Sequence, residues 1–372
     1  MAEPFSLKDQ LFNAETVAVL AAGFEKAGVF DGARFVARVV ERLPVLELKQ
    51  RIAMIAEELA KELPQDFPDA AAAILASLPP PLDPNLRDDD FGQFIYAPLG
   101  VFVETQGLEH HRDLSLDLLE ALTQRFSMEF SIRAFLTRWP DATLERMQDW
   151  SQHSHYHVRR LVSEGTRPRL PWAARVDLPL DQTLPLLDRL HADPTRFVTR
   201  SVANHLNDIS KAQPDVVLDR LEHWVFQNAQ DTKELDWMRK HALRGLIKAG
   251  HPATMLHLGY RPDAEVTVKD VAFAPTALLR GQRLTIDAEL VAQTKTPVIV
   301  DYVIDFMKNN GESSPKVFKW KVAQLGAGKP LRLTKTHHFK NDATTFRLYP
   351  GRHVLHIQVN GRRVWSGDFM LG

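Results

Sequence analysis

A short helical motif recurs in this chain at intervals of 40 residues. The apolar residues Val158, Val198 and Met238 occupy the same position in three aligned six-residue segments. A helical period of about 40 residues is typical of HEAT-like repeats. Such repeats stack pairs of helices into a curved solenoid with a concave face. The spacing therefore predicts an α-solenoid over this part of the chain.

Helical patterning extends well beyond these repeats. Apolar residues recur at helical spacing between positions 35 and 63, where helix-forming residue types dominate. The prolines between positions 79 and 84 interrupt the pattern, because proline cannot continue a helix and constrains the residue before it. Helical periodicity resumes near residue 113 and continues to about residue 258.

The character of the chain changes after Gly259-Tyr260-Arg261-Pro262. Short β-branched or aromatic segments, often alternating, now lie between turn signals; they span 265–273, 283–291, 298–306, 316–322, 344–348 and 353–359. Asn360-Gly361 between two strand-like runs is a strong signal for a two-residue hairpin. Six or seven such strands indicate an antiparallel β-sandwich. We therefore expect two domains, an α-solenoid at 1–260 and an all-β sandwich at 263–372.

The composition limits the chemistry that is available. The chain of 372 residues contains no cysteine, which excludes disulfides, thiolate zinc sites, iron–sulfur clusters and a cysteine nucleophile. No apolar run approaches the roughly 18 residues that a membrane span requires. The first residues show no signal-peptide pattern. We therefore expect a cytoplasmic protein without a membrane segment.

The net charge of −1 conceals an uneven distribution. Residues 261–372 hold 17 lysines and arginines against 10 aspartates and glutamates, a net charge of +7, and the remainder of the chain carries −8. Overall neutrality therefore does not exclude a nucleic-acid partner.

The repeat also places positive charges in phase. Arg160, Arg200 and Lys240 fall at one repeat position, so they should project from the same side of the solenoid. A row of cations spaced by one repeat suits a linear polyanion such as a DNA backbone. The alternative is a set of solvated or ion-paired charges on helix faces.

The stretch 155–172 concentrates charged and aromatic residues. Its members with functional potential are Arg159, Arg160, Arg167, Arg169, Glu164 and Trp172. Arginine can bind phosphate through two N–H groups, and tryptophan can stack on a base. The alternatives are an ion pair between Glu164 and Arg160, four residues apart on a helix, and a packing role for Trp172.

Two further acidic residues lie in polar clusters. Asp208 belongs to a polar group near the end of a helix, where it could cap the helix or bridge to the next one. Glu129 could face the same groove as Glu164, or it could serve as a first-turn charge favoured by the helix dipole.

Motifs for metals and cofactors are lacking. No glycine-rich phosphate loop, nucleophile elbow or His-Glu-x-x-His pattern is found. His153, His155 and His157 are the best metal candidates: on a helix they would point to different faces, whereas on a strand they could share one, and isolated histidines are more often surface or capping residues. We therefore expect neither a metal nor a cofactor.

Several of these stretches together resemble the AlkC family of bacterial DNA glycosylases, which are built from HEAT-like repeats. The resemblance covers most of the chain from about residue 110 onward. It rests on the segments 129–133, 158–172, 201–211 and 241–244. In the tail, 302–310, 315–319 and 349–353 resemble the immunoglobulin-like domain that one branch of the family carries. The resemblance implies an immunoglobulin-like form for the predicted sandwich.

The resemblance also implies an activity. It predicts a monofunctional glycosylase that hydrolyses the N-glycosidic bond of cationic alkylated bases in double-stranded DNA, chiefly 3-methyladenine and also 3-methylcytosine. The family's catalytic carboxylates would fall on Glu129, Glu164 and Asp208, with Trp172 beside the lesion. DNA would be bound through Arg159, Arg160, Arg167, Arg169, Arg200 and Lys240.

We expect the protein to be a monomer. The reaction that the resemblance implies needs no cofactor, because a base that is already cationic leaves without a general acid. The alternative function is a non-catalytic HEAT-repeat scaffold that binds nucleic acid or protein.

Overall fold

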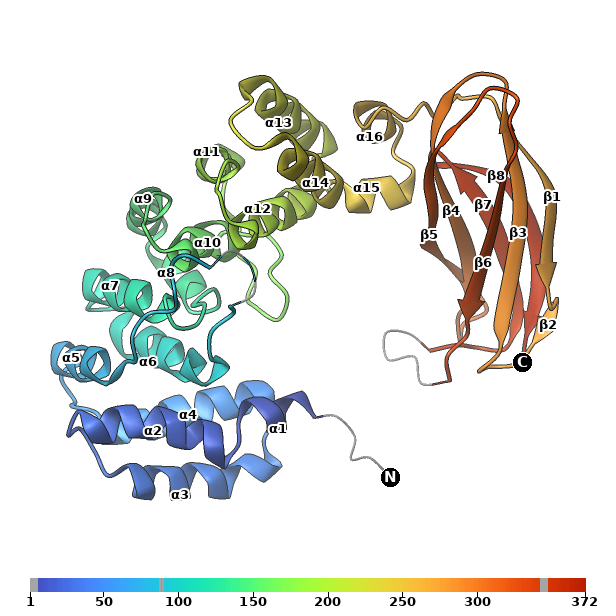
Figure 1. Cartoon of the computed structure of the whole chain (residues 1–372). Helices are drawn as coiled ribbons and strands as arrows, with labels where there is room; N and C mark the ends of the chain where they lie inside the picture. The colour runs from blue at the N-terminus through green and yellow to red at the C-terminus, as the bar shows by residue number, and fades with distance from the viewer. Residues whose placement is uncertain (1–5, 87, 89, 342–346) are drawn as a thin grey trace. The chain divides into compact units, whose positions relative to one another are not determined.

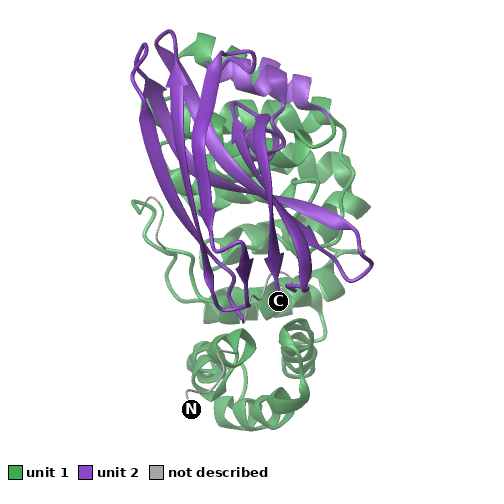
Figure 2. Cartoon of the chain, turned by 90° about the vertical axis from the view of Figure 1, so that its right-hand side faces the viewer, with its two compact units in different colours: residues 1–212, 220–242 green, residues 213–219, 243–372 purple. Residues whose placement is uncertain are grey.

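The computed structural model describes residues 6–86, 88, 90–341 and 347–372. The chain divides into two compact units (Figure 2): unit 1 comprises 1–212 and 220–242, and unit 2 comprises 213–219 and 243–372. In this division the last two helices, between residues 243 and 260, belong to the same compact unit as the β-strands. The division proposed from the sequence, at 260–263, instead follows the change from helices to strands.

Unit 1 is helical, as predicted (Figure 1). Its helices up to the start of the repeats are α1 (Leu7–Leu11), α2 (Ala14–Lys26), α3 (Gly32–Arg42), α4 (Leu48–Glu62), α5 (Phe67–Ser77), α6 (Ala97–Gly107) and α7 (Arg112–Thr123). They continue as α8 (Ile132–Arg138), α9 (Pro140–Trp150), α10 (Tyr156–Gly165), α11 (Leu180–Leu190), α12 (Arg196–Ile209) and α14 (Thr232–Ala242). Helix α13 (Pro214–Gln227) begins in unit 2 and ends in unit 1. Single 3-10 turns lie at Leu43–Val45 and Phe94–Tyr96.

The 40-residue repeat corresponds to successive helices. Val158 lies on α10, Val198 on α12 and Met238 on α14, and all three side chains are fully buried. Helix α12 packs against both α10 and α14, while α9 and α11 form a neighbouring layer (Figure 1). The period thus brings one residue per repeat to the same interior position, and the HEAT-like architecture is confirmed.

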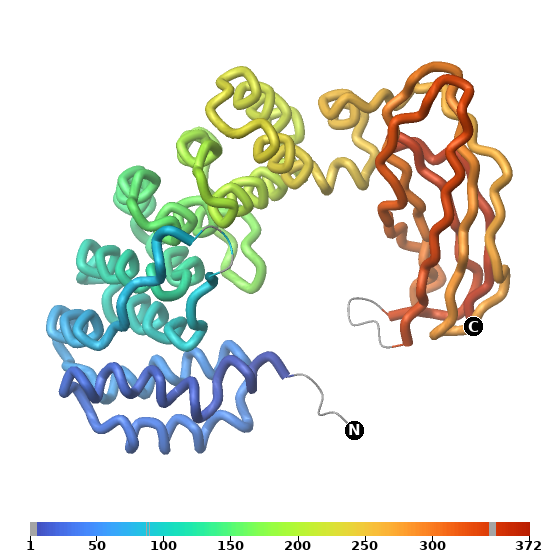
Figure 3. The backbone as a smooth tube through the Cα atoms, in the orientation of Figure 1, coloured from blue at the N-terminus to red at the C-terminus, as the bar shows by residue number. Residues whose placement is uncertain are grey.

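The predicted break at the prolines is also confirmed. Helix α5 ends at Ser77, and the described residues between it and the 3-10 turn at Phe94 form no helix (Figure 3). This segment is attached to α10 by two histidines: Nε2 of His155 lies 2.9 Å from the carbonyl oxygen of Leu82, and Nε2 of His157 lies 2.9 Å from that of Asp90.

Besides the start of α13, the described residues of unit 2 form two short helices and a two-layer β-sandwich. The helices are α15 (Arg244–Ala249) and α16 (Pro252–His257). The strands are β1 (Val266–Ala274), β2 (Ala277–Leu278), β3 (Arg283–Ala292), β4 (Thr296–Met307), β5 (Ser313–Leu325), β6 (Leu331–His338), β7 (Gly351–Val359) and β8 (Arg362–Leu371). One sheet has the order β1-β3-β6 and the other β2-β8-β7-β4-β5. Their inner faces share one buried apolar cluster, which confirms the predicted sandwich.

The expected hairpin is present between β7 and β8. Asn360 and Gly361 have φ of 46° and 83°, the left-handed conformation that a tight two-residue turn requires at both positions. Of the strand expected at 344–348, residues 344–346 lie outside the described residues, and 347–348 are not in a strand.

Within the described residues, no helix has the length and apolar character needed to cross a membrane.

Close packing at the end of α10 depends on Gly165. A Cβ atom there would lie 2.7 Å from Cγ2 of Ile132 on α8, a distance that requires the two helices to shift. We predict that Gly165→Ala lowers the free energy of unfolding, measured by urea denaturation, by about 1–3 kcal/mol.

Gly32→Ala is the matched control for this variant. Its added Cβ would meet the side chain of Glu25, whose flexible carboxylate end is nearest, with Oε2 at 3.1 Å, and whose Cβ is at an ordinary contact distance of 3.4 Å, so stability should hardly change. Equal stability of the Gly165→Ala protein and the wild type would contradict the packing argument.

Candidate active site

Three acidic side chains from separate parts of unit 1 meet in one network of arginines. Glu129 lies in the turn before α8, Glu164 on the last turn of α10, and Asp208 on the last turn of α12. Arg160 and Arg167 connect them. We call these five residues the carboxylate cluster.

Of the three carboxylates, Glu164 has the most hydrogen-bond and ion-pair partners. Its side chain is only 6% exposed. Oε1 accepts a hydrogen bond of 2.6 Å from Arg167 Nη1, and Oε2 accepts one of 2.6 Å from the hydroxyl of Ser201 on α12. The ion pair with Arg160 considered from the sequence is also present, with 3.6 Å between Nη2 and Oε2. Glu164 is therefore fixed by partners on both sides.

Arg167 joins two buried carboxylates. Besides its bond to Glu164, it donates from Nε to Oδ2 of Asp208 at 2.9 Å. The other oxygen of Asp208 accepts a hydrogen bond of 3.0 Å from Lys211. Asp208 therefore bridges back to the loop after α10 in the preceding repeat, whereas the alternative considered from the sequence was a bridge to the next helix.

Arg160 joins Glu164 to Glu129. Its Nη1 donates to Oε2 of Glu129 at 2.7 Å, and Ser127 Oγ donates to the same oxygen at 2.8 Å. The guanidinium also lies 4.5 Å from the ring centroid of Phe197, a cation–π contact that holds it in place.

The arginines keep Glu164 in its charged form. Burial alone would raise the pKa of this carboxyl, but attraction to Arg160 and Arg167 and the bonds from Ser201 and Arg167 outweigh it, so the pKa lies below the usual 4.5. Burial opposes the charge of Arg160 and Arg167 as well, yet the neighbouring carboxylates raise the pKa of both. Glu164 is therefore a carboxylate at neutral pH.

Arg133 fastens the loop that follows α10. Its Nη1 donates to the carbonyl oxygens of Gly165, at 2.7 Å, and Arg167, at 2.9 Å, and its Nε donates to that of Ala174 at 2.7 Å. Burial, together with the nearby charge of Arg167, lowers the pKa of Arg133 to about 10. One buried arginine thus fixes both ends of the loop that carries Trp172.

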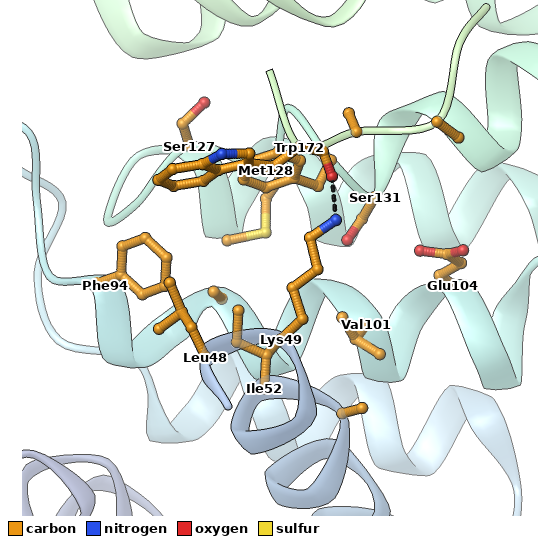
Figure 4. Close-up of a pocket in the computed structure, with 15 residues that line it drawn as sticks. Leu48, Lys49, Ile52, Phe94, Val101, Glu104, Ser127, Met128, Ser131 and Trp172 are labelled. Atoms are coloured by element: carbon orange, nitrogen blue, oxygen red, sulfur yellow. Dashed lines mark hydrogen bonds between the residues drawn. The ribbon is translucent and has the colours of Figure 1, made fainter. Parts of the chain in front are cut away.

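Trp172 is presented to solvent by this loop. Its side chain is 64% exposed, and its φ of 65° is uncommon for a residue with a Cβ atom. Its carbonyl oxygen accepts a hydrogen bond from Lys49 on α4, and its indole lies over a cavity (Figure 4). The packing role considered for Trp172 would have required a buried ring.

The predicted DNA-binding residues differ in what they contact. Arg159 pairs with Asp193, with 3.2 Å between Nη2 and Oδ1, and Arg200 pairs with Asp88. Lys240 is largely exposed beside Asp236, and Arg169 is exposed on the loop before Trp172. Arg160, Arg200 and Lys240 lie on α10, α12 and α14, one per repeat, as their sequence phase required.

Among the described residues, no group of three histidine, aspartate or glutamate side chains is arranged to hold a metal ion. His155 and His157 instead contact backbone carbonyls, and burial lowers the pKa of His157 to about 4.

With this geometry established, three comparisons place the chain among known proteins. A family model described as "Uncharacterised protein YhaZ, C-terminal Ig-like domain" matches residues 267–372. The chain is 32% identical over 335 residues to Uncharacterized protein YhaZ of Bacillus subtilis (strain 168), covering 89% of each protein. It is 35% identical to the alkylpurine DNA glycosylase AlkC of Pseudomonas fluorescens, solved bound to DNA containing an abasic site analog. That match has a TM-score of 0.88 and covers 99% of this chain and 100% of the other.

The chain belongs to the AlkC family. Its solenoid and immunoglobulin-like sandwich are those of an AlkC-type protein over nearly the whole length.

The structure adds residues to the AlkC-type site that the sequence reasoning did not single out. Ser127, Arg133 and Ser201 bond to the cluster or its loop, and all three lie within or beside the segments that carried the resemblance. Lys49 and Glu104 border the cavity from the N-terminal helices. No motif marked these two, because their role depends on a contact between distant parts of the chain.

The ion pairs of the carboxylate cluster lead to a prediction for the stability of the protein. Arg167→Met leaves Glu164 and Asp208 buried without their shared partner, and removing one member of a buried ion pair costs about 3–5 kcal/mol. We therefore expect the variant to lose about that much free energy of unfolding in urea denaturation.

Arg169→Met is the control, since Arg169 lies two residues away on the same loop but is exposed. It should unfold like the wild type. If both variants lost the same stability, the cluster would not be the cause.

Proposed function

We propose that this protein is a monofunctional DNA glycosylase that hydrolyses the N-glycosidic bond of cationic alkylated bases, with 3-methyladenine as the chief substrate and 3-methylcytosine as a second. The observation that carries the proposal is the carboxylate cluster. It joins three carboxylates through two arginines next to the loop that carries the exposed Trp172, in a chain similar over nearly its whole length to an alkylpurine DNA glycosylase.

The chemistry fits these residue types. A base alkylated at a ring nitrogen is already cationic, so it can leave without being protonated. As the bond to C1′ breaks, both of its electrons go to the base and cancel the positive charge, and the sugar gains oxocarbenium character. Water adds to C1′ and gives up a proton. Carboxylates fixed beside the sugar stabilise the developing cation and accept that proton.

We assign the catalytic roles to Glu164, Glu129 and Asp208. Preorganisation favours such catalysis, since fixed charges need no rearrangement when the transition state forms. Arg160 and Arg167 supply it: they keep the carboxylates in place and hold the pKa of Glu164 low. Trp172 is assigned to the charged base, on whose face its exposed ring can form a cation–π contact.

DNA binding is assigned to the cationic residues predicted from the sequence. Arg169, Arg200 and Lys240 are the most accessible, and they are proposed to contact phosphates directly. Arg159, Arg160 and Arg167 are ion-paired within unit 1 and are proposed to act at the DNA through the surfaces they hold in place. The net charge of +7 after residue 260 provides a further electrostatic attraction.

The test is release of methylated bases under single-turnover conditions. Duplex DNA treated with dimethyl sulfate is incubated with excess protein, and free 3-methyladenine is measured by chromatography. We expect release by the wild type and a loss of about 100-fold or more for Glu164→Gln, because a fixed transition-state charge is removed while the shape is kept.

DNA affinity of Glu164→Gln should stay within a few-fold of the wild type, and Glu57→Gln, at an exposed position on α4, should release base normally. Binding of DNA without any release by the wild-type protein would instead favour the non-catalytic scaffold. Normal release by Glu164→Gln would remove Glu164 from the chemistry.

A further inference from the structure

A cavity of about 390 Å³ lies under Trp172 (Figure 4). It is bordered by α4, α6 and the turn before α8, all within unit 1. Ser127 connects it to the cluster, because this residue lines the cavity and also donates to Glu129. The cavity therefore adjoins the place where an alkylated base would be cut from its sugar.

The lining is that of a site for a flat aromatic ligand. Trp172 and Phe94 contribute aromatic faces, Met128 a polarisable thioether, and Leu48 and Ile52 aliphatic surface. Ligand sites are mostly apolar clefts of about 300–1,000 Å³ with a few polar groups that fix orientation. This cavity lies at the small end of that range, so it suits one small ring system rather than a nucleotide with sugar and phosphate.

The polar group that would set orientation is Glu104 on α6. It borders the cavity, and burial raises the pKa of its carboxyl. Within the described part of the chain, no charged neighbour contributes to that shift. In its charged form, which a pH well above the usual Glu pKa favours, this side chain only accepts hydrogen bonds and is a partner for N–H groups. It favours a ring that carries an amino group over one that presents a carbonyl oxygen at the same position.

Lys49 also lines the cavity. It extends from α4 and donates its hydrogen bond to the carbonyl oxygen of Trp172, which ties the tryptophan loop across the cavity (Figure 4). Its ammonium group is thereby directed at the backbone of the loop.

We propose that this cavity binds the free amino-bearing base after excision, with Trp172 stacked on the ring and Glu104 accepting from the amino group. The inference rests on the proposed glycosylase function. Hydrolysis separates the base from the sugar, so the base can enter the cavity without prior rotation of its nucleotide out of the duplex. The site is then a product site, and free base should inhibit repeated turnover.

Two probes test the proposal on the protein without DNA. Adenine bears an amino group at position 6 beside an unprotonated N1, whereas hypoxanthine bears an oxo group at position 6 beside an N1–H. Binding of each is measured by isothermal calorimetry at pH 8, along with binding of 3-methyladenine. We expect adenine and 3-methyladenine to bind with millimolar or tighter Kd, and hypoxanthine to bind at least tenfold more weakly than adenine.

Variants locate the binding. Val101→Phe fills the cavity and should weaken adenine binding at least tenfold, whereas Val19→Phe, at an exposed position on α2, should not change it. Glu104→Leu should remove the preference for adenine over hypoxanthine, which keeps the test valid if Val101→Phe fails to fold.

The outcomes separate this inference from the glycosylase proposal. Base release from methylated DNA by a protein that binds no free base at 10 mM would overturn the cavity assignment and leave the activity standing, as would adenine binding that Val101→Phe does not weaken. Base binding by a protein that releases nothing from methylated DNA would overturn the activity and with it the product role.

Discussion

The ion pairs of Arg167 with Glu164 and Asp208 are the interaction on which the candidate site depends. Carboxylates as buried as these two would be costly to charge without partners, and Arg167 supplies a partner to both through separate nitrogens. Because the two carboxylates lie on different helices, the same ion pairs also fix α10 relative to α12. Arg167 thus serves both the packing of these helices and the proposed site.

The repeat architecture explains how such an arrangement arises. Helices α10, α12 and α14 place equivalent residues in phase, so polar residues near the ends of successive helices approach each other across the stack. The loop after α10 then folds back along the helix ends, held by Arg133, and carries Trp172 out to solvent. A regular scaffold therefore positions an irregular, functional loop.

Much of the fold could be predicted because its signals are local. The 40-residue spacing and Asn360-Gly361 specified repeats and a hairpin directly, but β6 at Leu331–His338 was missed. This strand lies at the edge of its sheet, where exposure permits lysines and histidines that obscure the alternation. For the site, the spacing of four residues between Arg160 and Glu164 on one helix predicted their ion pair. The pair of Arg167 with Asp208, 41 residues apart, and the cavity bordered by Lys49 and Glu104 required the tertiary structure.

The central claim is that the arginines keep Glu164 ionised although it is buried. Its carboxyl carbon can be followed by ¹³C NMR as a function of pH, with the signal assigned from its loss in Glu164→Gln. The folded-state pKa lies below the unfolded value of 4.5, so the carboxylate should persist as the pH falls through 4.5, and the stability it contributes should be lost only below that. We predict a titration midpoint below 4.5 in the wild type and a higher one in Arg167→Met. A midpoint above 4.5 in the wild-type protein would contradict it.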